Sequence, residues 1–222
     1  MIKAVFWDND GVLVDTEKLY FQETRELLLR TGVILTETLF RQISLVEGRN
    51  AFDLAKAKGV SQEEIERHHG ERNRRYTELL MGGVSVIDGA EEVLGALRGR
   101  VSQAIVTSSR REHFDAIHAR TGLLAWFDFV LTREDYLLSK PNPEPYLTAL
   151  KKSGFKADEC LVVEDSPRGL ASALAADIRC LVIPNDLTQG ASFTGAWRVL
   201  ESCREIPAEI LRLDRNGQRA LV

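Results

Sequence analysis

The sequence predicts an α/β fold: a doubly wound parallel sheet with an α-helical domain inserted after the first strand. A short apolar run, Ala4–Trp7, ends abruptly in two carboxylates one residue apart and is typical of a buried strand. From Glu17 to about Gly83 the sequence reads as helices, with few β-branched runs. From Val84 onward, apolar strands alternate with helical segments, which is the pattern of a parallel sheet with crossover helices.

The composition is that of an ordinary globular protein and argues against several classes of partner. Of 222 residues, 44% are hydrophobic and 28% are charged, so the chain can bury a sizeable core. A net charge of −4 gives no reason to expect a nucleic acid or an anionic membrane as a partner. No apolar segment approaches membrane-spanning length, and the N-terminal run is broken at Asp8 before it could serve as a signal peptide.

The three cysteines are widely spaced and form no CxxC pair, which argues against a disulfide framework or a zinc site. Cys160 and Cys180 open or lie within apolar runs, so we expect both to be core residues. Reduced cysteines and the lack of a targeting segment predict a cytoplasmic location.

Four helices are expected between Glu17 and Gly83. The first has one apolar face, Thr36 caps the second, and the third covers residues 50–58. A capping box at Ser61 opens the fourth, a long polar helix that runs toward Leu80. The apolar face of the first helix consists of Leu19, Tyr20, Leu27 and Leu28.

The fourth helix carries a run of basic side chains, His68, His69, Arg72, Arg74 and Arg75. Such a cluster could bind an anion, but a solvated basic face is the more ordinary outcome and the one that we expect. The two histidines are adjacent rather than four residues apart, so they would not share a helix face as metal ligands.

Strands and helices are expected to alternate after residue 84. Asn142 and Pro143 supply an N-cap and a first helical residue for one of these helices. The chain after Asn185 has no clear pattern. In chain order the elements are helix 90–97, strand 103–106, helix 111–121, an apolar segment at 129–131, helix 143–153, strand 160–163, helix 169–176 and strand 179–183.

Three of the apolar strands end in polar clusters. In open α/β sheets, ligands bind outside the carboxyl ends of the strands. If the three strands are neighbours, these clusters and the proline-rich loop that carries Lys140 meet in one crevice. The clusters are Asp8 with Asp10, Thr107 with Ser108 and Ser109, and Glu164 with Asp165.

Four carboxylates in one crevice would repel one another unless a divalent cation lay among them. Because the ligands are all oxygens, without histidine or cysteine, the cation that we expect is Mg²⁺. The hydroxyls of residues 107–109, Lys140 and Mg²⁺ together complement a phosphoryl group. Asp8 could then attack phosphorus and form an aspartyl-phosphate, while Asp10 protonates the leaving oxygen and later activates water.

Each of these residues also has an ordinary interpretation. Lys140 could be a surface lysine, Thr107 could cap the following helix, and Glu164–Asp165 could be a solvated loop. A calcium-binding loop fits poorly, because Phe6 would occupy its first ligand position and a strand precedes it. The joint occurrence of the clusters is what favours a phosphoryl-transfer site.

Together these residues resemble the motifs of the haloacid dehalogenase-like hydrolases over nearly the whole chain. Asp8-Asn9-Asp10-Gly11-Val12 resembles the first motif of the family and Thr107 the hydroxyl motif. Residues 140–146 match the lysine motif and residues 163–169 the acidic motif. The resemblance implies a Rossmann-like core of residues 1–15 and 84–222, and a helical cap of residues 16–83 that closes over it.

The resemblance also implies roles for single residues. Asp8 would be the nucleophile, and Asp10 the acid/base that gives its backbone carbonyl to Mg²⁺. Asp165 would complete the metal site, with Glu164 bound directly or through water. Thr107 and Lys140 would belong to the catalytic group.

Substrate contacts are expected from Ser108, Ser109 and two residues of the cap. Arg49, in Gly48-Arg49-Asn50, resembles the arginine of a substrate loop. Tyr20 stands where the mutases of the family have a histidine that couples cap closure to the acid/base aspartate.

Within the family, the Glu-Asp-Ser-Pro form of the acidic motif resembles the branch of sugar-phosphate phosphatases and β-phosphoglucomutases, while Asp10 weighs against the dehalogenase and phosphonatase branches. Because Tyr20 replaces the histidine of the mutases, we expect a Mg²⁺-dependent phosphatase of a small phosphorylated metabolite, such as a sugar phosphate or phosphoglycolate. A mutase-like phosphoryl transfer and a non-catalytic binding domain on the same fold are the alternatives.

Overall fold

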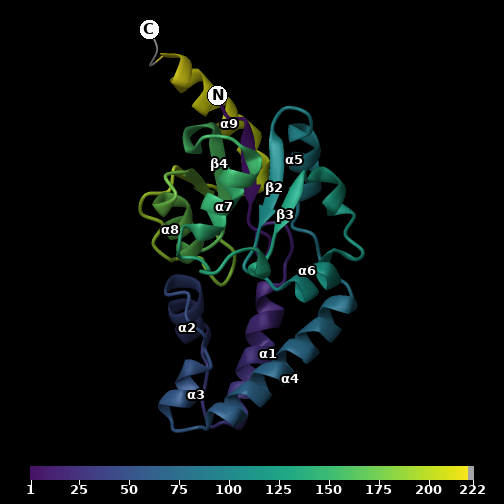
Figure 1. Cartoon of the computed structure of the whole chain (residues 1–222), viewed down its shortest axis with the longest axis vertical. Coiled ribbons are helices and arrows are strands. Elements are labelled where there is room, and N and C mark those ends of the chain that lie inside the picture. Colours follow the sequence, from purple (N-terminus) through teal and green to yellow (C-terminus); the bar gives the residue numbers. More distant parts are fainter. Residues whose placement is uncertain (220–222) are drawn as a thin grey trace.

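The computed structural model describes residues 1–219, with side chains up to residue 215, and contains a parallel sheet with helices on both faces (Figure 1). The strands lie in the order β3-β2-β1-β4-β5-β6, and every adjacent pair is parallel. The predicted doubly wound α/β fold is therefore confirmed. The strands are β1 (Ala4–Trp7), β2 (Ser102–Val106), β3 (Phe129–Leu131), β4 (Cys160–Glu164), β5 (Arg179–Val182) and β6 (Arg198–Val199).

Most helices lie within one to three residues of their predicted bounds. The C-terminal segment, where the sequence has no clear pattern, contributes β6 and α9. The helices are α1 (Glu17–Arg30), α2 (Glu37–Phe40), α3 (Asp53–Ala57), α4 (Gln62–Met81), α5 (Ala90–Leu97), α6 (Arg111–His118), α7 (Glu144–Ser153), α8 (Pro167–Ala175) and α9 (Ile206–Arg219). Single turns are η1 (Arg41–Val46), which is π-helical, and the 3₁₀ turns η2 (Leu123–Trp126), η3 (Arg133–Asp135), η4 (Ala157–Glu159) and η5 (Cys203–Glu205).

The sheet separates two apolar layers, because successive side chains of a strand point to opposite faces. Val5 and Trp7 pack with residues of α5, α6 and α9. Ala4 and Phe6 pack with residues of α7 and α8 on the other face. All four side chains are buried. The three cysteines are free and buried, and the burial of Cys160 and Cys180 confirms the expectation for these two.

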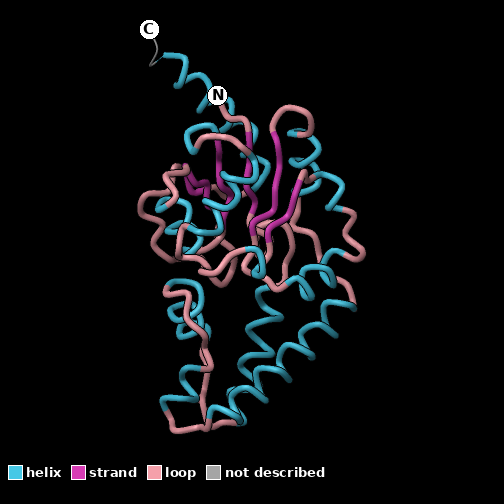
Figure 2. Tube along the Cα trace, viewed as in Figure 1, coloured by secondary structure: helices cyan, strands magenta, loops and turns pink. Residues whose placement is uncertain are grey.

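The helices between residues 17 and 81, called the helical insert below, lie beyond the carboxyl edge of the sheet (Figures 1 and 2). They enclose an apolar cluster of their own around Leu27, Phe40 and Phe52. Two of the predicted caps form: Thr36 accepts from Leu39 N and Ser61 accepts from Glu64 N, both at 3.2 Å. The domain boundaries at 15/16 and 83/84 stay predictions, which this arrangement supports.

Helix α4 does not present a uniform basic face, and here the sequence-based expectation is wrong. His68 and Arg72 are buried, because they lie on the same stripe of the helix as Tyr76 and Leu80. Arg74 points away from this stripe, is exposed and pairs with Glu78 at 2.6 Å, as a solvated face requires.

The helical insert meets the core at several places. The two chain crossings lie side by side, where Asp15 N donates to Ser85 O at 2.9 Å. Helix α4 contacts α6, and η1 contacts α8. A core loop at residues 184–190 reaches into the insert: Leu187 is 4% exposed and belongs to the apolar cluster of the insert, and its carbonyl accepts from Arg41 Nε at 2.5 Å.

Candidate active site

The three strands with polar ends are neighbours in the sheet, so their ends meet. Strand β1 pairs with β2 on one side and β4 on the other, with Trp7 opposite Ile105 and Val163. A cavity of about 320 Å³ lies between this edge and the helical insert. From the core it is lined by Asp8, Asp10, Thr107, Ser108, Ser109 and Lys140, and from the insert by Tyr20, Arg49, His69 and Arg72, among others.

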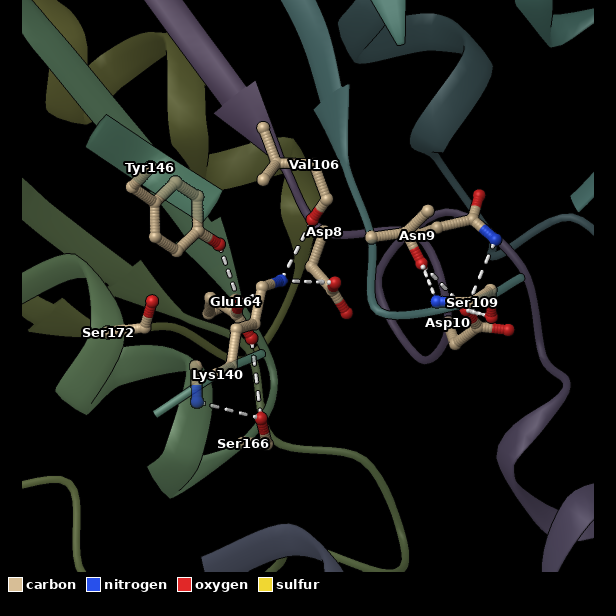
Figure 3. Close-up of polar contacts among 12 residues, drawn as sticks. Asp8, Asn9, Asp10, Val106, Ser109, Lys140, Tyr146, Glu164, Ser166 and Ser172 are labelled. Carbon is tan, nitrogen blue, oxygen red and sulfur yellow. Dashed lines mark hydrogen bonds and ion pairs between the residues drawn. The ribbon is translucent and has the colours of Figure 1, made fainter. Parts of the chain in front are cut away.

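Lys140 is the centre of a buried ion cluster (Figure 3). Its Nζ lies 2.6 Å from Asp8 Oδ1, 2.6 Å from Glu164 Oε1 and 2.8 Å from the carbonyl oxygen of Val106. The side chain is 2% exposed, so Lys140 is no surface lysine. Burial by itself lowers the pKa of this ammonium, but the charges of Asp8 and Glu164 outweigh burial and raise it.

Glu164 is fully buried beneath the cavity and connects the ion cluster to two helices. It accepts hydrogen bonds from Tyr146 Oη of α7 at 2.6 Å and from Ser166 Oγ at 3.3 Å. Gly169 in the first turn of α8 makes room for it, since a Cβ there would overlap the carboxylate. Glu164 and Asp165 are therefore not a solvated loop.

Asp10 is held by four donors in one orientation. Its carboxylate accepts from Thr16 Oγ1 at 2.5 Å, Ser109 Oγ at 2.7 Å, Thr107 Oγ1 at 3.2 Å and Asn9 Nδ2 at 3.4 Å. These donors come from the N-cap residue of α1, the end of β2 and the first motif itself. Asp10 is thus positioned by groups from three segments of the chain.

Thr107 does not cap helix α6. The N-cap residue of that helix is Arg110, and no side chain caps it. Thr107 Oγ1 instead accepts from Ser109 N at 3.0 Å while it donates to Asp10. This arrangement folds the end of β2 around the carboxylate of Asp10.

Asn9 is fully buried and lies between Asp10 and a buried histidine of α6. Its Oδ1 lies 2.8 Å from His118 Nε2, and Thr121 Oγ1 lies 2.9 Å from Nδ1 of the same ring. Burial lowers the pKa of His118 to about 4, so the ring is neutral near pH 7 and donates from Nε2. This bond turns the amide of Asn9 so that its Nδ2 faces Asp10.

Three carboxylates form a group that fits a metal ion. Ligand oxygens of Asp8, Glu164 and Asp165 lie within 4.8 Å of one another and are buried. Asp165 Oδ2 accepts from Asn185 Nδ2 at 2.7 Å. Gly11, at φ +83°, allows this close approach, because a Cβ there would overlap both side chains. The all-oxygen donor set is the one that Mg²⁺ prefers.

The electrostatics of this group also fit a cation. Burial is the largest cause that raises the pKa of Asp8, to about 7, although Lys140 lowers it. Burial likewise raises the pKa of Asp165 well above its ordinary value, and repulsion from Asp8 adds to this. A divalent cation among the three carboxylates would favour their ionised forms. The side chain of Asp10 lies outside this group of three, and the contact of its backbone carbonyl with the ion stays a prediction.

The predicted substrate contacts all line the cavity, and their roles stay predictions. The Ser108 hydroxyl is buried and has no partner among the described residues. Ser109 is already engaged by Asp10. Tyr20 packs edge-on against Tyr76, with ring centroids 5.3 Å apart. Arg49 pairs with Glu47 at 2.9 Å and is 56% exposed.

Sequence reasoning missed several residues of the site. Glu17 and Arg168 line the cavity, and burial raises the pKa of Glu17 to about 8 although Arg168 lowers it. Asn185 stands just before the segment that has no clear pattern. The position of Arg72 was predictable: residues 68, 72, 76 and 80 recur every four residues, and this spacing places Arg72 on an inward stripe with His68, Tyr76 and Leu80.

Two arginines of the helical insert should differ in their effect on kinetics. We expect Arg49→Ala to raise KM, because the side chain lines the cavity and would lose a contact with bound substrate. Arg74→Ala is its matched control and should leave kinetics and stability nearly unchanged, because exposed ion pairs contribute at most about 1 kcal/mol. Steady-state kinetics and thermal unfolding of both variants measure this. Equal KM values for Arg49→Ala and the unmodified protein would remove Arg49 from the site.

The parallel core, the buried lysine–carboxylate cluster and the insert over the strand ends define a hydrolase of the phosphoryl-transfer type. The model of the haloacid dehalogenase-like hydrolase family matches residues 5–183. The chain belongs to this family, and the expectation of a phosphoric monoester hydrolase is confirmed at the level of the class. The structure has no helix in residues 1–219 with the length and apolarity needed to cross a membrane.

Relatives of known name agree with this class. The chain is 30% identical over 224 residues to a putative phosphatase, YhcW, from Bacillus subtilis (strain 168), covering 98% of this chain and all of the relative. It is 31% identical to a phosphorylated carbohydrates phosphatase from Thermotoga maritima, covering 89% and 93% of the two chains. The crystal structure of a family IA variant 3 hydrolase from Entamoeba histolytica is similar, with a TM-score of 0.81, 27% identity and coverage of 96% and 99%.

Proposed function

We propose that the protein is a Mg²⁺-dependent phosphatase that hydrolyses a small phosphorylated metabolite, such as a sugar phosphate, through an aspartyl-phosphate on Asp8. The observation that carries the proposal is the contact of Lys140 with Asp8 at 2.6 Å, at the end of a cavity that also contains the fixed carboxylate of Asp10. A phosphatase of phosphorylated carbohydrates among the relatives supports the substrate class.

In this proposal each side chain of the site has a separate chemical role. Lys140 fixes Asp8 through Oδ1, so Oδ2, which accepts no hydrogen bond from the described residues, is the oxygen left to attack phosphorus. Asp10 donates a proton to the leaving oxygen and later removes one from the attacking water. The unpartnered Ser108 hydroxyl supplies a donor to a phosphoryl oxygen, Lys140 supplies positive charge beside Asp8, and Thr107 holds Asp10 in place.

Asp8, Asp165, Glu164 and the backbone of Asp10 would hold Mg²⁺, which when bound offsets the charge of the phosphoryl group. Glu164 is the least available ligand, because Lys140, Tyr146 and Ser166 already engage its two oxygens. Asp165 has one oxygen bound to Asn185, and its other oxygen accepts no hydrogen bond from the described residues.

Removal of the metal should abolish activity. We expect a chelator to stop phosphate release and added Mg²⁺ to restore it, because the three buried carboxylates otherwise repel an anionic substrate. Asp165→Ala should raise the Mg²⁺ concentration needed for half-maximal activity severely, whereas Asp186→Ala, a change at an exposed carboxylate of the neighbouring loop, should not. Calorimetric titration of Mg²⁺ into both variants provides a readout that is independent of turnover. Full turnover in the chelator would remove the metal from the proposal.

The test of the function as a whole is a screen of phosphorylated metabolites, in which free phosphate and isomeric sugar phosphate are measured in one reaction with Mg²⁺ present. We expect mainly free phosphate, because a mutase must protect the aspartyl-phosphate from water and Tyr20 replaces the histidine that would couple cap closure to Asp10. Isomerisation that outruns phosphate release, with a bisphosphorylated sugar as primer, would favour the mutase alternative. Binding without turnover of any substrate would favour the non-catalytic one.

A further inference from the structure

The cavity extends from the catalytic aspartates to a buried arginine of α4 that has no counter-charge. Arg72 is 3% exposed and lines the cavity together with Asp8. Its Nη2 lies 2.8 Å from His69 Nε2, its Nη1 lies 3.5 Å from Thr24 Oγ1, and its Nε has no partner. Among the side chains of residues 1–215, no carboxylate oxygen lies within 4.0 Å of this guanidinium.

The contacts that hold Arg72 do not neutralise it. Burial is the largest cause that lowers the pKa of His69, to about 4, and the charge of Arg72 adds to the effect. The imidazole is therefore neutral, and its Nε2 accepts from Arg72. The guanidinium also stacks on the ring of Tyr20, with its central carbon 4.2 Å from the ring centroid. Such stacking orients a cation but adds no negative charge.

Other arginines of the same helix are paired, which makes Arg72 distinct. Arg75, one turn away on the outer side, lies 2.8 Å from a Glu23 oxygen and 2.7 Å from a Glu26 oxygen. Arg74 pairs with Glu78. A buried charge without a partner is costly, so buried charges in proteins are paired or complete a ligand site. Arg72 lines the same cavity as the catalytic residues.

We propose that Arg72 forms a distal anion subsite and that the substrate therefore carries a second anionic group, a phosphate or a carboxylate, besides the phosphoryl group that is transferred. The inference rests on the proposed function, because it assigns the other end of the substrate to the insert side of the same cavity. Arg110, at the start of α6, also lines this cavity and adds positive charge. A planar guanidinium with open donors matches either oxyanion in a bidentate manner.

The experiment compares substrates that differ only in the second anionic group. Phosphate release is measured for fructose 1,6-bisphosphate against fructose 6-phosphate, and for 3-phosphoglycerate against glycerol 3-phosphate. We expect the unmodified protein to prefer the member with the second anionic group in at least one pair. The pair that shows the preference indicates whether that group is a phosphate or a carboxylate. Arg72→Met should reduce that preference in kcat/KM by roughly tenfold to a hundredfold, the range for a lost hydrogen bond to a charged group.

Two further variants separate recognition from a structural role. Arg72→Lys keeps the positive charge but lacks the planar donor arrangement of a guanidinium, so it should retain part of the substrate preference. Arg74→Met, an exposed position on the same helix, should retain all of it. In the ligand-free protein Arg72→Met should leave Tm unchanged or raise it, because an unpaired buried charge is removed.

A lower Tm of Arg72→Met together with an unchanged substrate preference would show a structural arginine and overturn the subsite. An unmodified protein that releases phosphate from fructose 6-phosphate and glycerol 3-phosphate as fast as from their partners with the second anionic group would also overturn it and leave the phosphatase proposal standing. Absence of phosphate release from every probe would refute the phosphatase proposal alone. Calorimetric titration of fructose 1,6-bisphosphate into the unmodified protein and Arg72→Met would then decide the subsite: weaker binding by the variant supports it, and equal or undetectable binding by both refutes it.

Discussion

Asp8→Asn is expected to reduce turnover by several orders of magnitude, because the amide keeps the shape of the carboxylate but lacks the oxygen nucleophile. Asp8 lies directly after β1, between two neighbouring strands, so a single-atom change should leave the sheet intact. Phosphate release under saturating Mg²⁺ and substrate measures the effect on kcat. Circular dichroism of the variant measures whether the fold is retained.

Asp15→Asn is the matched control for this experiment. It removes a carboxylate seven residues along the same segment, but Asp15 is exposed and does not line the cavity. Its turnover should match that of the unmodified protein. Near-normal turnover of Asp8→Asn in a folded protein would end the covalent mechanism, and a water-attack mechanism would have to replace it.

Asp10→Asn is expected to lower kcat by about a hundred- to ten-thousand-fold, the usual range for a lost general acid/base. The structure sharpens this expectation, because the four donors around Asp10 would now meet an amide that offers only one acceptor oxygen. Phosphate release is the measurement, with substrates whose leaving groups differ in basicity.

A substrate with a good leaving group, such as 4-nitrophenyl phosphate, tests the acid role of Asp10 separately from its base role. The loss of turnover should be smaller with this substrate than with an alkyl phosphate, since the nitrophenolate departs without a proton. Equal losses for the two substrates would show that Asp10 positions other groups rather than donating the proton.

The fold and the ends of the strands were predictable because they depend on local patterns. Asp8, Thr107 and Glu164 each follow or end an apolar strand, and parallel pairing brings such ends together whatever their distance in sequence. The direction of each side chain was less predictable. Ser109 serves Asp10 rather than standing free, and Asn9 has a partner in His118 that no local pattern indicates.

Helix α4 shows why the insert side of the site was harder to read. When charged residues occupy both faces of a helix, the apolar stripe that normally marks the buried face is weak. Arg72 and Arg74 look alike in sequence, yet one is buried in the cavity wall and the other is solvated. Asn185 was inaccessible for another reason: it reaches Asp165 from an irregular loop whose path only tertiary contacts define.

The loop at residues 184–190 connects the core to the helical insert at a third place, by non-covalent contacts, besides the two chain crossings. Leu187 of this core loop is buried in the helical insert, and two residues earlier Asn185 holds Asp165 at 2.7 Å. An outward movement of the insert must therefore either remove Leu187 from its apolar surroundings or displace the loop. Removing Leu187 costs on the order of 1.5–3 kcal/mol for a leucine side chain. Displacing the loop strains the hydrogen bond from Asn185 to Asp165. Opening of the cavity and displacement of Asp165, the proposed metal ligand, are in this way mechanically linked.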